Sequence, residues 1–268
     1  AEARGTGAVE EPAPGPPAEA PPPATVDPVA ATWARLRAFA PDPRLLDRHL
    51  VVTAGRQDPA HAAFDVLRTK TVEALATRGW RRVGVTSPTK GCGKSFAALN
   101  LAVTLSRYDD RRTLLLDLDL RMPSLARMLG VAEPGAIGDL LRGLVPPEAH
   151  LLRIGPNPMR IGPRLALGLN GLREAFAAEL FHQTRTAEAF ARIDAALAPD
   201  VVLVDLPPAL AQDDVIALKP LLDCVLMVAA GGQTTPRQLR EAVRRLGEDL
   251  PVLGVVLNKA EGEGVDEY

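Results

Sequence analysis

The chain has 268 residues, of which 47% are hydrophobic and 24% charged, so it can bury a full core as one large domain. Its 31 Lys and Arg oppose 33 Asp and Glu, and the resulting formal net charge of -2 excludes a global basic field that would attract nucleic acid or anionic lipid. No apolar run approaches the roughly 20 residues of a membrane-spanning helix, and two cysteines beside apolar runs are typical of a reduced, cytoplasmic protein.

The two ends of the chain differ in composition from the middle. Residues 1–28 carry eight of the 25 prolines and almost no large apolar side chains, which predicts a disordered tail. That tail is either a simple spacer or a docking motif for a proline-binding groove. It lacks the basic start and apolar stretch of a secretory signal. We expect a single domain over residues 29–262 and a flexible acidic tail over 263–268.

Apolar strands alternate with helical patterns through the rest of the sequence. The spacing of apolar residues predicts a short amphipathic helix over 29–40. Strands are expected at 82–87, 112–119, 201–208, 224–230 and 252–258, and helices at 94–108 and 235–248. Each strand is too continuously apolar for a sheet with one exposed face. The pattern therefore predicts an α/β fold with a mostly parallel sheet covered by helices on both faces. The less regular stretch 146–167 is expected to be an insertion or an edge region.

The segment PTKGCGKS (88–95) lies between an expected strand and an expected helix, which is the context of a phosphate-binding loop. It departs from G-x-x-x-x-G-K-[ST] only at its first position, where proline replaces glycine. Gly91 and Gly93 allow successive N–H groups to face an anion, and the helix that follows points its positive end at the same place. Lys94 is expected to reach the β and γ phosphates, and Ser95 to place its hydroxyl on magnesium.

Carboxylates follow two other apolar strands. Asp117 and Asp119 stand two residues apart at the carboxyl end of the strand expected at 112–119, at the edge where ligands bind in open parallel sheets. Asp205 ends the strand expected at 201–208 and is followed by Pro208 in the spacing D-x-x-P. Such carboxylates suit magnesium binding, water positioning or proton abstraction.

These three motifs resemble those of the bacterial tyrosine kinases of capsule and exopolysaccharide synthesis. That family belongs to the deviant P-loop ATPases, which also include the ParA/MinD type and have a three-layer architecture. Its second motif runs three aliphatic residues and then D-x-D-x-R, which Asp117, Asp119 and Arg121 match. Its Walker B form, three aliphatic residues and then D-x-x-P, is matched by Asp205 and Pro208. The resemblance covers about residues 60–260.

The resemblance implies ATP and magnesium as cofactors and assigns roles residue by residue. Lys94, Asp117 and Asp119 would be catalytic, with Asp117 as the candidate base. Magnesium would be held by Ser95, Asp117 and Asp205. The nucleotide-binding residues would be Thr89, Lys90, Gly91, Cys92, Gly93, Lys94, Ser95, Phe96, Arg121 and Asn258. Asn258 stands where relatives contact adenine, although an Asn at a strand end is a turn former just as often.

The ParA/MinD type differs at the loop. Those ATPases carry an extra lysine one place after the first loop position, and this chain has Thr89 there. Its nearest lysine, Lys90, is shifted by one residue, where it either leans across a dimer interface or is solvated. The position of Thr89 and the D-x-D-x-R motif both favour the polysaccharide kinases.

The chain departs from those kinases at two places. They commonly end in a tyrosine cluster that is phosphorylated in trans, whereas this chain has only Tyr108 and Tyr268. Tyr268 is therefore the candidate phosphoacceptor. Their ring-forming helix reads E-x-x-R-x-x-R, and the matching positions here are Ala62, Asp65 and Arg68, so only the last is kept and self-association stays open.

The functional expectation is a cytoplasmic, magnesium- and ATP-dependent tyrosine autokinase that regulates exopolysaccharide polymerisation or export. Its expected partner is the cytoplasmic tail of an inner-membrane chain-length regulator, which would hold it at the inner face of the membrane, and nucleic acid is not an expected partner. The alternatives are a nucleotide-dependent switch ATPase of the same fold without kinase activity, a ParA/MinD-like positioning ATPase, and a non-enzymatic protein that binds nucleotide only for structure.

Overall fold

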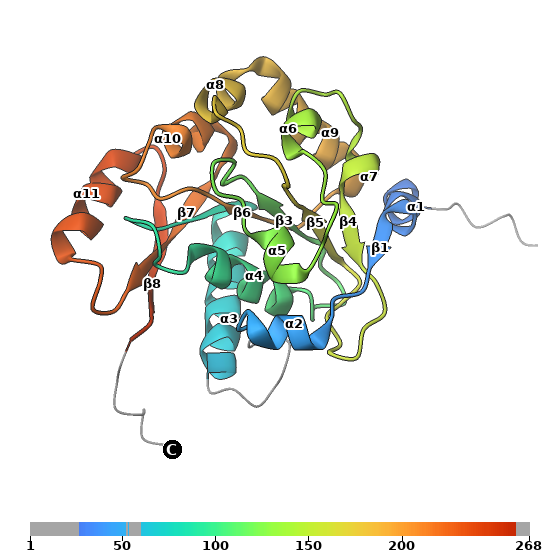
Figure 1. The fold of residues 1–268 in the computed structure, drawn as a ribbon, viewed down its shortest axis with the longest axis horizontal. Helices are drawn as coiled ribbons and strands as arrows, with labels where there is room; N and C mark the ends of the chain where they lie inside the picture. The colour runs from blue at the N-terminus through green and yellow to red at the C-terminus, as the bar shows by residue number, and fades with distance from the viewer. Residues whose placement is uncertain (1–26, 52, 54–59, 261–268) are drawn as a thin grey trace, which may run out of the picture.

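One eight-stranded sheet forms the centre of the molecule, in the order β1-β4-β5-β3-β6-β2-β7-β8 (Figure 1). The computed structural model describes residues 27–51, 53 and 60–260, so Tyr268 and the expected tail over 263–268 lie outside it, as does the proline-rich stretch 1–26. The strands are β1 (Arg37–Phe39), β2 (Arg82–Thr86), β3 (Thr113–Asp117), β4 (Leu152–Ile154), β5 (Leu165–Gly168), β6 (Val201–Asp205), β7 (Cys224–Ala230) and β8 (Val252–Asn258).

Every neighbouring pair of strands is parallel except β4 and β5. The predicted α/β fold with a mostly parallel sheet is confirmed. The carboxyl ends of β2, β3 and β6 lie together because β6 pairs with both of the others. The register places Asp117 of β3 directly beside Asp205 of β6, and Asp205 beside Val85 of β2.

Helices cover both faces of the sheet (Figure 1). One buried cluster joins the sheet to α2 (Pro43–Arg48), α3 (Ala60–Arg78), α4 (Lys94–Leu105) and α5 (Leu125–Leu129). A second cluster, on the other face, joins it to α1 (Pro28–Arg35), α6 (Ile137–Leu141), α8 (Ala177–His182), α9 (Thr184–Leu197), α10 (Asp214–Leu218) and α11 (Pro236–Leu246). The short elements α7 (Pro147–His150) and η2 (Lys219–Leu221) complete the set. No helix within the described ranges has the length and apolarity needed to cross a membrane.

The amino-terminal segment differs from its prediction. The helix expected over 29–40 begins at Pro28, where Asp27 caps it by accepting a hydrogen bond from the backbone of Val29 at 3.0 Å. Pro28 therefore belongs to the folded domain rather than to the tail. The helix ends at Arg35 because Leu36 leaves helical geometry, with ψ at 135°, and residues 37–39 gain backbone partners by pairing with β4.

Other expected boundaries are displaced by a few residues or missed. The helix expected at 94–108 ends at Leu105, and the strand expected at 112–119 ends at Asp117. The region 146–167 is more regular than predicted, because it contains β4 and most of β5, and β5 pairs with both β3 and β4 inside the sheet. Strands of three and four residues are too short to show a pattern in sequence.

Candidate functional site

A cavity of about 520 Å³ opens where the chain leaves β2, β3 and β6. The phosphate-loop segment forms one wall, and the loops after β3 and β6 form the other two. Its lining residues are Lys90, Gly91, Gly93, Lys94, Ser95, Phe96, Asp119, Arg121, Met122, Ser124, Arg127, Pro207, Pro208, Ala211, Gln212, Asp214 and Lys259. Three separately predicted motifs therefore meet at one cavity.

The loop between β2 and α4 has the backbone of an anion site. Gly91 and Gly93 have φ angles of 82° and 92°, in the left-handed region that favours glycine. A Cβ on Gly93 would lie 2.1 Å from the side-chain nitrogen of Asn258, so a larger residue there would have to displace Asn258 from the loop. Helix α4 begins at the next residue, Lys94, and no side chain in the described part of the protein caps its amino end. Its first N–H groups are therefore available to a ligand anion.

Asn258, the last residue of β8, and Lys259, which follows it, both form hydrogen bonds to the outer side of this loop. The side-chain amide of Asn258 donates a hydrogen bond to the carbonyl of Cys92 at 2.9 Å, and Lys259 Nζ donates to the carbonyl of Gly91 at 2.8 Å. Carbonyls held outward leave the N–H groups of the loop facing inward. The role of Lys259 was not predicted from the sequence. Its place directly after the last strand, at the edge of the sheet where the phosphate loop lies, could have indicated it.

The side chains of Thr89 and Cys92 support the loop from inside the protein. Cys92 is 1% exposed, and its Sγ lies 3.6 Å from Thr89 Oγ1 and 3.5 Å from Thr234 Oγ1. Burial raises the pKa of the thiol, but the hydrogen bonds from Thr234 and Thr89 outweigh burial and leave the pKa below its usual value. Lys90 is exposed at the rim of the cavity.

Lys94 bridges the loop and the carboxylates. Its Nζ lies 2.7 Å from Asp119 Oδ2, 3.5 Å from Asp205 Oδ1 and 3.3 Å from Ser95 Oγ. Burial lowers the pKa of Lys94, but the charges of Asp205 and Asp119 outweigh burial and raise it. The lysine is therefore charged, and in this structure it neutralises carboxylates of its own site.

Asp117 and Asp205 are both fully buried at the ends of their strands. Asp117 Oδ2 accepts hydrogen bonds from the backbone of Ser124 at 3.1 Å and Leu125 at 3.0 Å. Its Oδ1 and Asp205 Oδ2 have no hydrogen-bond partner among the described residues, and Asp205 Oδ1 has only the ion-pair contact with Lys94 at 3.5 Å. Burial and then the charge of Asp205 raise the pKa of Asp117 to about 8. Burial also raises the pKa of Asp205, against the opposing effect of Lys94.

These orphaned oxygens fit a magnesium ion. Mg²⁺ prefers oxygen ligands and is usually held by one or two carboxylates together with substrate phosphates and waters. Asp117, Asp205 and the hydroxyl of Ser95 would supply that protein share. The described ranges contain no group of three or more His, Cys, Asp or Glu arranged to hold a metal ion. Phosphate and water oxygens would have to complete the coordination.

Arg121 lines the cavity, and its side chain is held there by a carboxylate at the end of the loop after β6. Its guanidinium pairs with Asp214, with Nε 2.7 Å from Oδ2 and Nη2 2.9 Å from Oδ1. Asp214 is 1% exposed and begins α10. Sequence reasoning missed Asp214, which lies 93 residues from Arg121 and carries no motif of its own.

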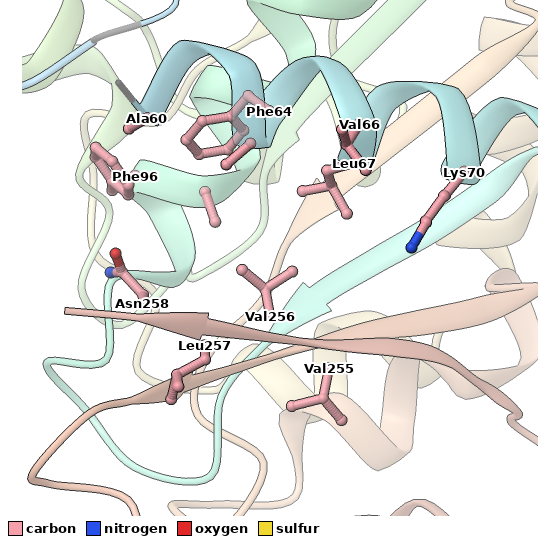
Figure 2. A pocket seen from close by; sticks show the side chains of 12 residues that line it. Ala60, Phe64, Val66, Leu67, Lys70, Phe96, Val255, Val256, Leu257 and Asn258 are labelled. Atoms are coloured by element: carbon pink, nitrogen blue, oxygen red, sulfur yellow. The ribbon is translucent and has the colours of Figure 1, made fainter. Parts of the chain in front are cut away.

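A second cavity of about 350 Å³ lies between α3 and β8 (Figure 2). Phe64 and Phe96 stand together at one end, with ring centroids 5.8 Å apart in an edge-to-face arrangement, and Asn258 lies beneath them. Leu67 and Val256 continue the apolar lining. Phe96 also lines the first cavity, so the two cavities adjoin at the start of α4.

The positions matching the ring-forming helix lie on α3. Arg68 Nη1 contacts Asp65 Oδ1 at 3.1 Å, and its guanidinium carbon lies 5.1 Å from the centre of the Tyr108 ring. The arginine kept from the E-x-x-R-x-x-R pattern is therefore engaged within its own chain.

The profile of the CobQ/CobB/MinD/ParA nucleotide binding domain matches residues 83–267. This match covers more than half of the chain and spans all three motifs. The chain belongs to that family of nucleotide-binding domains.

Within the family, several of the similar proteins are named as bacterial tyrosine kinases. The chain is 31% identical over 212 residues to the putative tyrosine-protein kinase EpsB of Ralstonia nicotianae, a match that covers 79% of this chain and 27% of EpsB. It is 31% identical over 204 residues to the succinoglycan biosynthesis transport protein ExoP of Rhizobium meliloti, covering 73% of this chain and 24% of ExoP. The BceF tyrosine kinase domain superposes with a TM-score of 0.66 at 27% identity, over 86% of this chain and 97% of that domain. The chain thus spans about a quarter of the length of EpsB and ExoP, and the predicted resemblance is confirmed.

Proposed function

We propose that the chain is a magnesium- and ATP-dependent tyrosine kinase domain that transfers the γ-phosphoryl group in line to a tyrosine hydroxyl. The observation that carries this proposal is the meeting of Lys94, which lines the cavity, with the buried Asp117 and Asp205 beneath it, beside an uncapped helix start. In phosphoryl transfer, catalysis consists mainly of positioning and of neutralising the charge on the transferred group. The cavity offers cationic, N–H and carboxylate groups for both tasks.

Each residue of the site has a defined task in that reaction. The N–H groups of the loop and Lys94 bind the phosphates, while Ser95, Asp117 and Asp205 hold the ion. Magnesium, when bound, would neutralise charge on the phosphate oxygens. As Lys94 turns to the phosphates, it releases Asp119, whose carboxylate then accepts a hydrogen bond from the attacking hydroxyl. Asp117 is the proposed base, and its pKa of about 8 is that of the site before the ion binds.

The nucleoside end of ATP fits the second cavity. Its apolar lining and the two aromatic rings suit a planar base, and the cavity adjoins the phosphate loop at Phe96 (Figure 2). Asn258 stands at the junction, where its amide nitrogen is already bonded to Cys92. The side-chain oxygen of Asn258 is then the atom available to a base amino group.

The names of the similar proteins suggest a biological role for the proposed kinase. The names of EpsB and ExoP link similar chains to tyrosine phosphorylation and to succinoglycan biosynthesis and transport. We infer that this domain regulates exopolysaccharide polymerisation or export from the cytoplasmic side. It would do so on the cytoplasmic tail of an inner-membrane chain-length regulator, and Tyr268 is the proposed phosphoacceptor.

The test is incubation of the purified chain with labelled ATP and magnesium, followed by mass spectrometry. Phosphate on Tyr268, absent in Lys94→Met and in Tyr268→Phe, is the expected result. Tyr268 that stays unmodified even with the partner's cytoplasmic tail present contradicts the kinase proposal.

A second function, a switch ATPase without kinase activity, is favoured by one observation. Tyr108, the other tyrosine of the chain, is partly buried with the guanidinium groups of Arg68 and Arg111 over its ring at 5.1 Å and 5.6 Å, so only Tyr268 is left as an acceptor. Slow ATP hydrolysis that requires Lys94, together with unmodified tyrosines, would identify this second function.

A further inference from the structure

The loop after β3 carries two charged residues that point to different partners. Asp119 Oδ2 contacts Lys94 Nζ at 2.7 Å, inside the cavity. Arg121, two residues on, forms a bidentate pair with the buried carboxylate of Asp214, at 2.7 Å and 2.9 Å. Because a bidentate pair fixes the angle as well as the distance between two groups, it holds this loop more firmly than a single contact would.

All three nitrogens of the Arg121 guanidinium have protein partners. Nε and Nη2 bind Asp214, and Nη1 donates to the carbonyl of Ala175 at 3.0 Å. The hydrogen bond that Arg121 donates to Asp214 is also the main reason that the pKa of Arg121 is raised. These bonds use three of the five N–H groups of the guanidinium and fix its plane, so its position is set by Asp214 and Ala175.

The contacts of Arg121 also bear on the turn that orients Asp119. The backbone of Met122 donates to Asp119 Oδ1 at 3.1 Å, which leaves Oδ2 for Lys94. The backbone of Glu174 donates to the carbonyl of Leu120 at 2.9 Å, next to the contact with Ala175. The turn is thus fixed on both sides of Arg121.

Through Asp214, the loop after β6 is joined to the loop after β3. That loop runs from Asp205 to α10, and its Pro207, Pro208 and Ala211 line the cavity. The ion pair therefore joins the two loops that follow the carboxylate-bearing strands β3 and β6. Losing Arg121 would leave Asp214 as a buried carboxylate without its partner, and the two loops would lose the contact that joins them.

We propose that Arg121, paired with Asp214, is a positioning residue that sets Asp119 against Lys94 for the transfer step and does not contact the nucleotide. The inference rests on the proposed function, because the step that it positions is phosphoryl transfer. It replaces the nucleotide-binding role that sequence similarity implied for Arg121.

The test compares Arg121→Gln, Arg121→Lys and Asp214→Asn with the wild-type chain in three measurements. These are MgADP affinity by calorimetry, kcat for ATP turnover, and amide hydrogen exchange of residues 118–124. The control is Arg82→Gln, which removes a partly buried ion pair with Asp194 (2.5 Å) at the amino end of β2, away from the cavity.

Arg121→Gln and Asp214→Asn should each lower kcat about tenfold or more, since small misplacements of catalytic groups are costly, while MgADP affinity stays within about threefold of wild type. Exchange over 118–124 should be faster in both variants. Arg121→Lys should recover only part of kcat, because an ammonium cannot form the bidentate pair. The double variant Arg121→Gln/Asp214→Asn should have a kcat no lower than that of the worse single variant. Arg82→Gln should match wild type in all three measurements.

Other outcomes overturn the inference. A tenfold loss of MgADP affinity in Arg121→Gln but not in Asp214→Asn identifies Arg121 as a nucleotide ligand. Unchanged exchange over 118–124 in the variants shows that the pair does not hold the loop, and Arg121→Lys supplies this measurement if the glutamine variant does not fold. A wild-type chain that binds MgADP but shows neither ATP turnover nor phosphorylation refutes the kinase proposal only. The hydrogen exchange and MgADP affinity of the variants still test whether the Arg121–Asp214 pair holds the loop.

Discussion

Asp117 and Asp205 lie side by side at paired positions of neighbouring parallel strands, both fully buried, and Lys94 is the one cation within ion-pair distance of Asp205 in the described part of the chain. Two carboxylates in one dry site cannot both ionise without cost. Without a further cation, Asp117 therefore favours its protonated form, and a bound cation would favour the ionised form.

Replacing Asp117 with Asn should stabilise the chain without ligand, and increasingly so as pH rises. The folded pKa of Asp117, about 8, lies above its usual value of 3.8, so folding takes up a proton between these values and stability falls as pH rises through that window. Asp117→Asn lacks this loss. Its melting temperature should exceed that of wild type by about 3 °C or more at pH 8 and by much less at pH 5. The exposed Asp110→Asn is the control, and an advantage that does not grow with pH contradicts the raised pKa.

Binding of magnesium and nucleotide should release a proton near neutral pH. If the ion takes the ionised form of Asp117, affinity rises with pH up to about 8, by at most roughly tenfold per pH unit. Calorimetry of MgADP binding in buffers with different ionisation enthalpies measures the released proton. Asp117→Asn should bind more weakly and lose the pH dependence. Binding without proton release in the wild type would place the ion elsewhere.

Gly93→Ala should abolish nucleotide binding, whereas Gly91→Ala should only weaken it. Both glycines have positive φ, so both substitutions carry backbone strain of about 1 kcal/mol. The added Cβ at 93 also meets Asn258 at 2.1 Å, while the one at 91 meets nothing within 4 Å. MgADP titration of both variants provides the comparison, since Gly91→Ala controls for strain alone. Equal losses in the two variants would mean that the contact with Asn258 is unimportant.

Lys259→Met should lower nucleotide affinity by about threefold to tenfold, through loss of one hydrogen bond that shapes the phosphate loop. The bond runs from Nζ to the carbonyl of Gly91 at 2.8 Å. Lys90→Met is the matched control, because it removes the same charge from an exposed position on the rim of the cavity. If both variants lose affinity equally, the effect is one of general charge and not of loop shape.

The positions of site residues could be predicted from the sequence where a motif lies at the end of a regular strand or at the start of a regular helix. Asp117 and Asp205 were predicted at one edge because each ends a continuously apolar strand, and parallel strands bring such ends together. Prediction failed where the partner is remote and carries no motif. Asp214 became visible only through its contact with Arg121, and β5 only through its place in the sheet, since four residues leave no periodicity to recognise. The contact of Asn258 with adenine stays a prediction, and the bond from its amide nitrogen to the carbonyl of Cys92 could not be read from the sequence, because these residues lie 166 positions apart.

The lengths of β3 and β6 and the register between them place Asp117 next to Asp205. Both strands have five residues, and their register begins at Thr113 opposite Val201 and ends at Asp117 opposite Asp205. Inserting or deleting a single residue in either strand would turn one carboxylate to the opposite face of the sheet, because side chains alternate. The apolar residues between those ends never touch a substrate, yet their number decides whether the two acids meet. Strand length is in this sense part of the active site, and length changes within either strand should be tolerated less than substitutions that keep it.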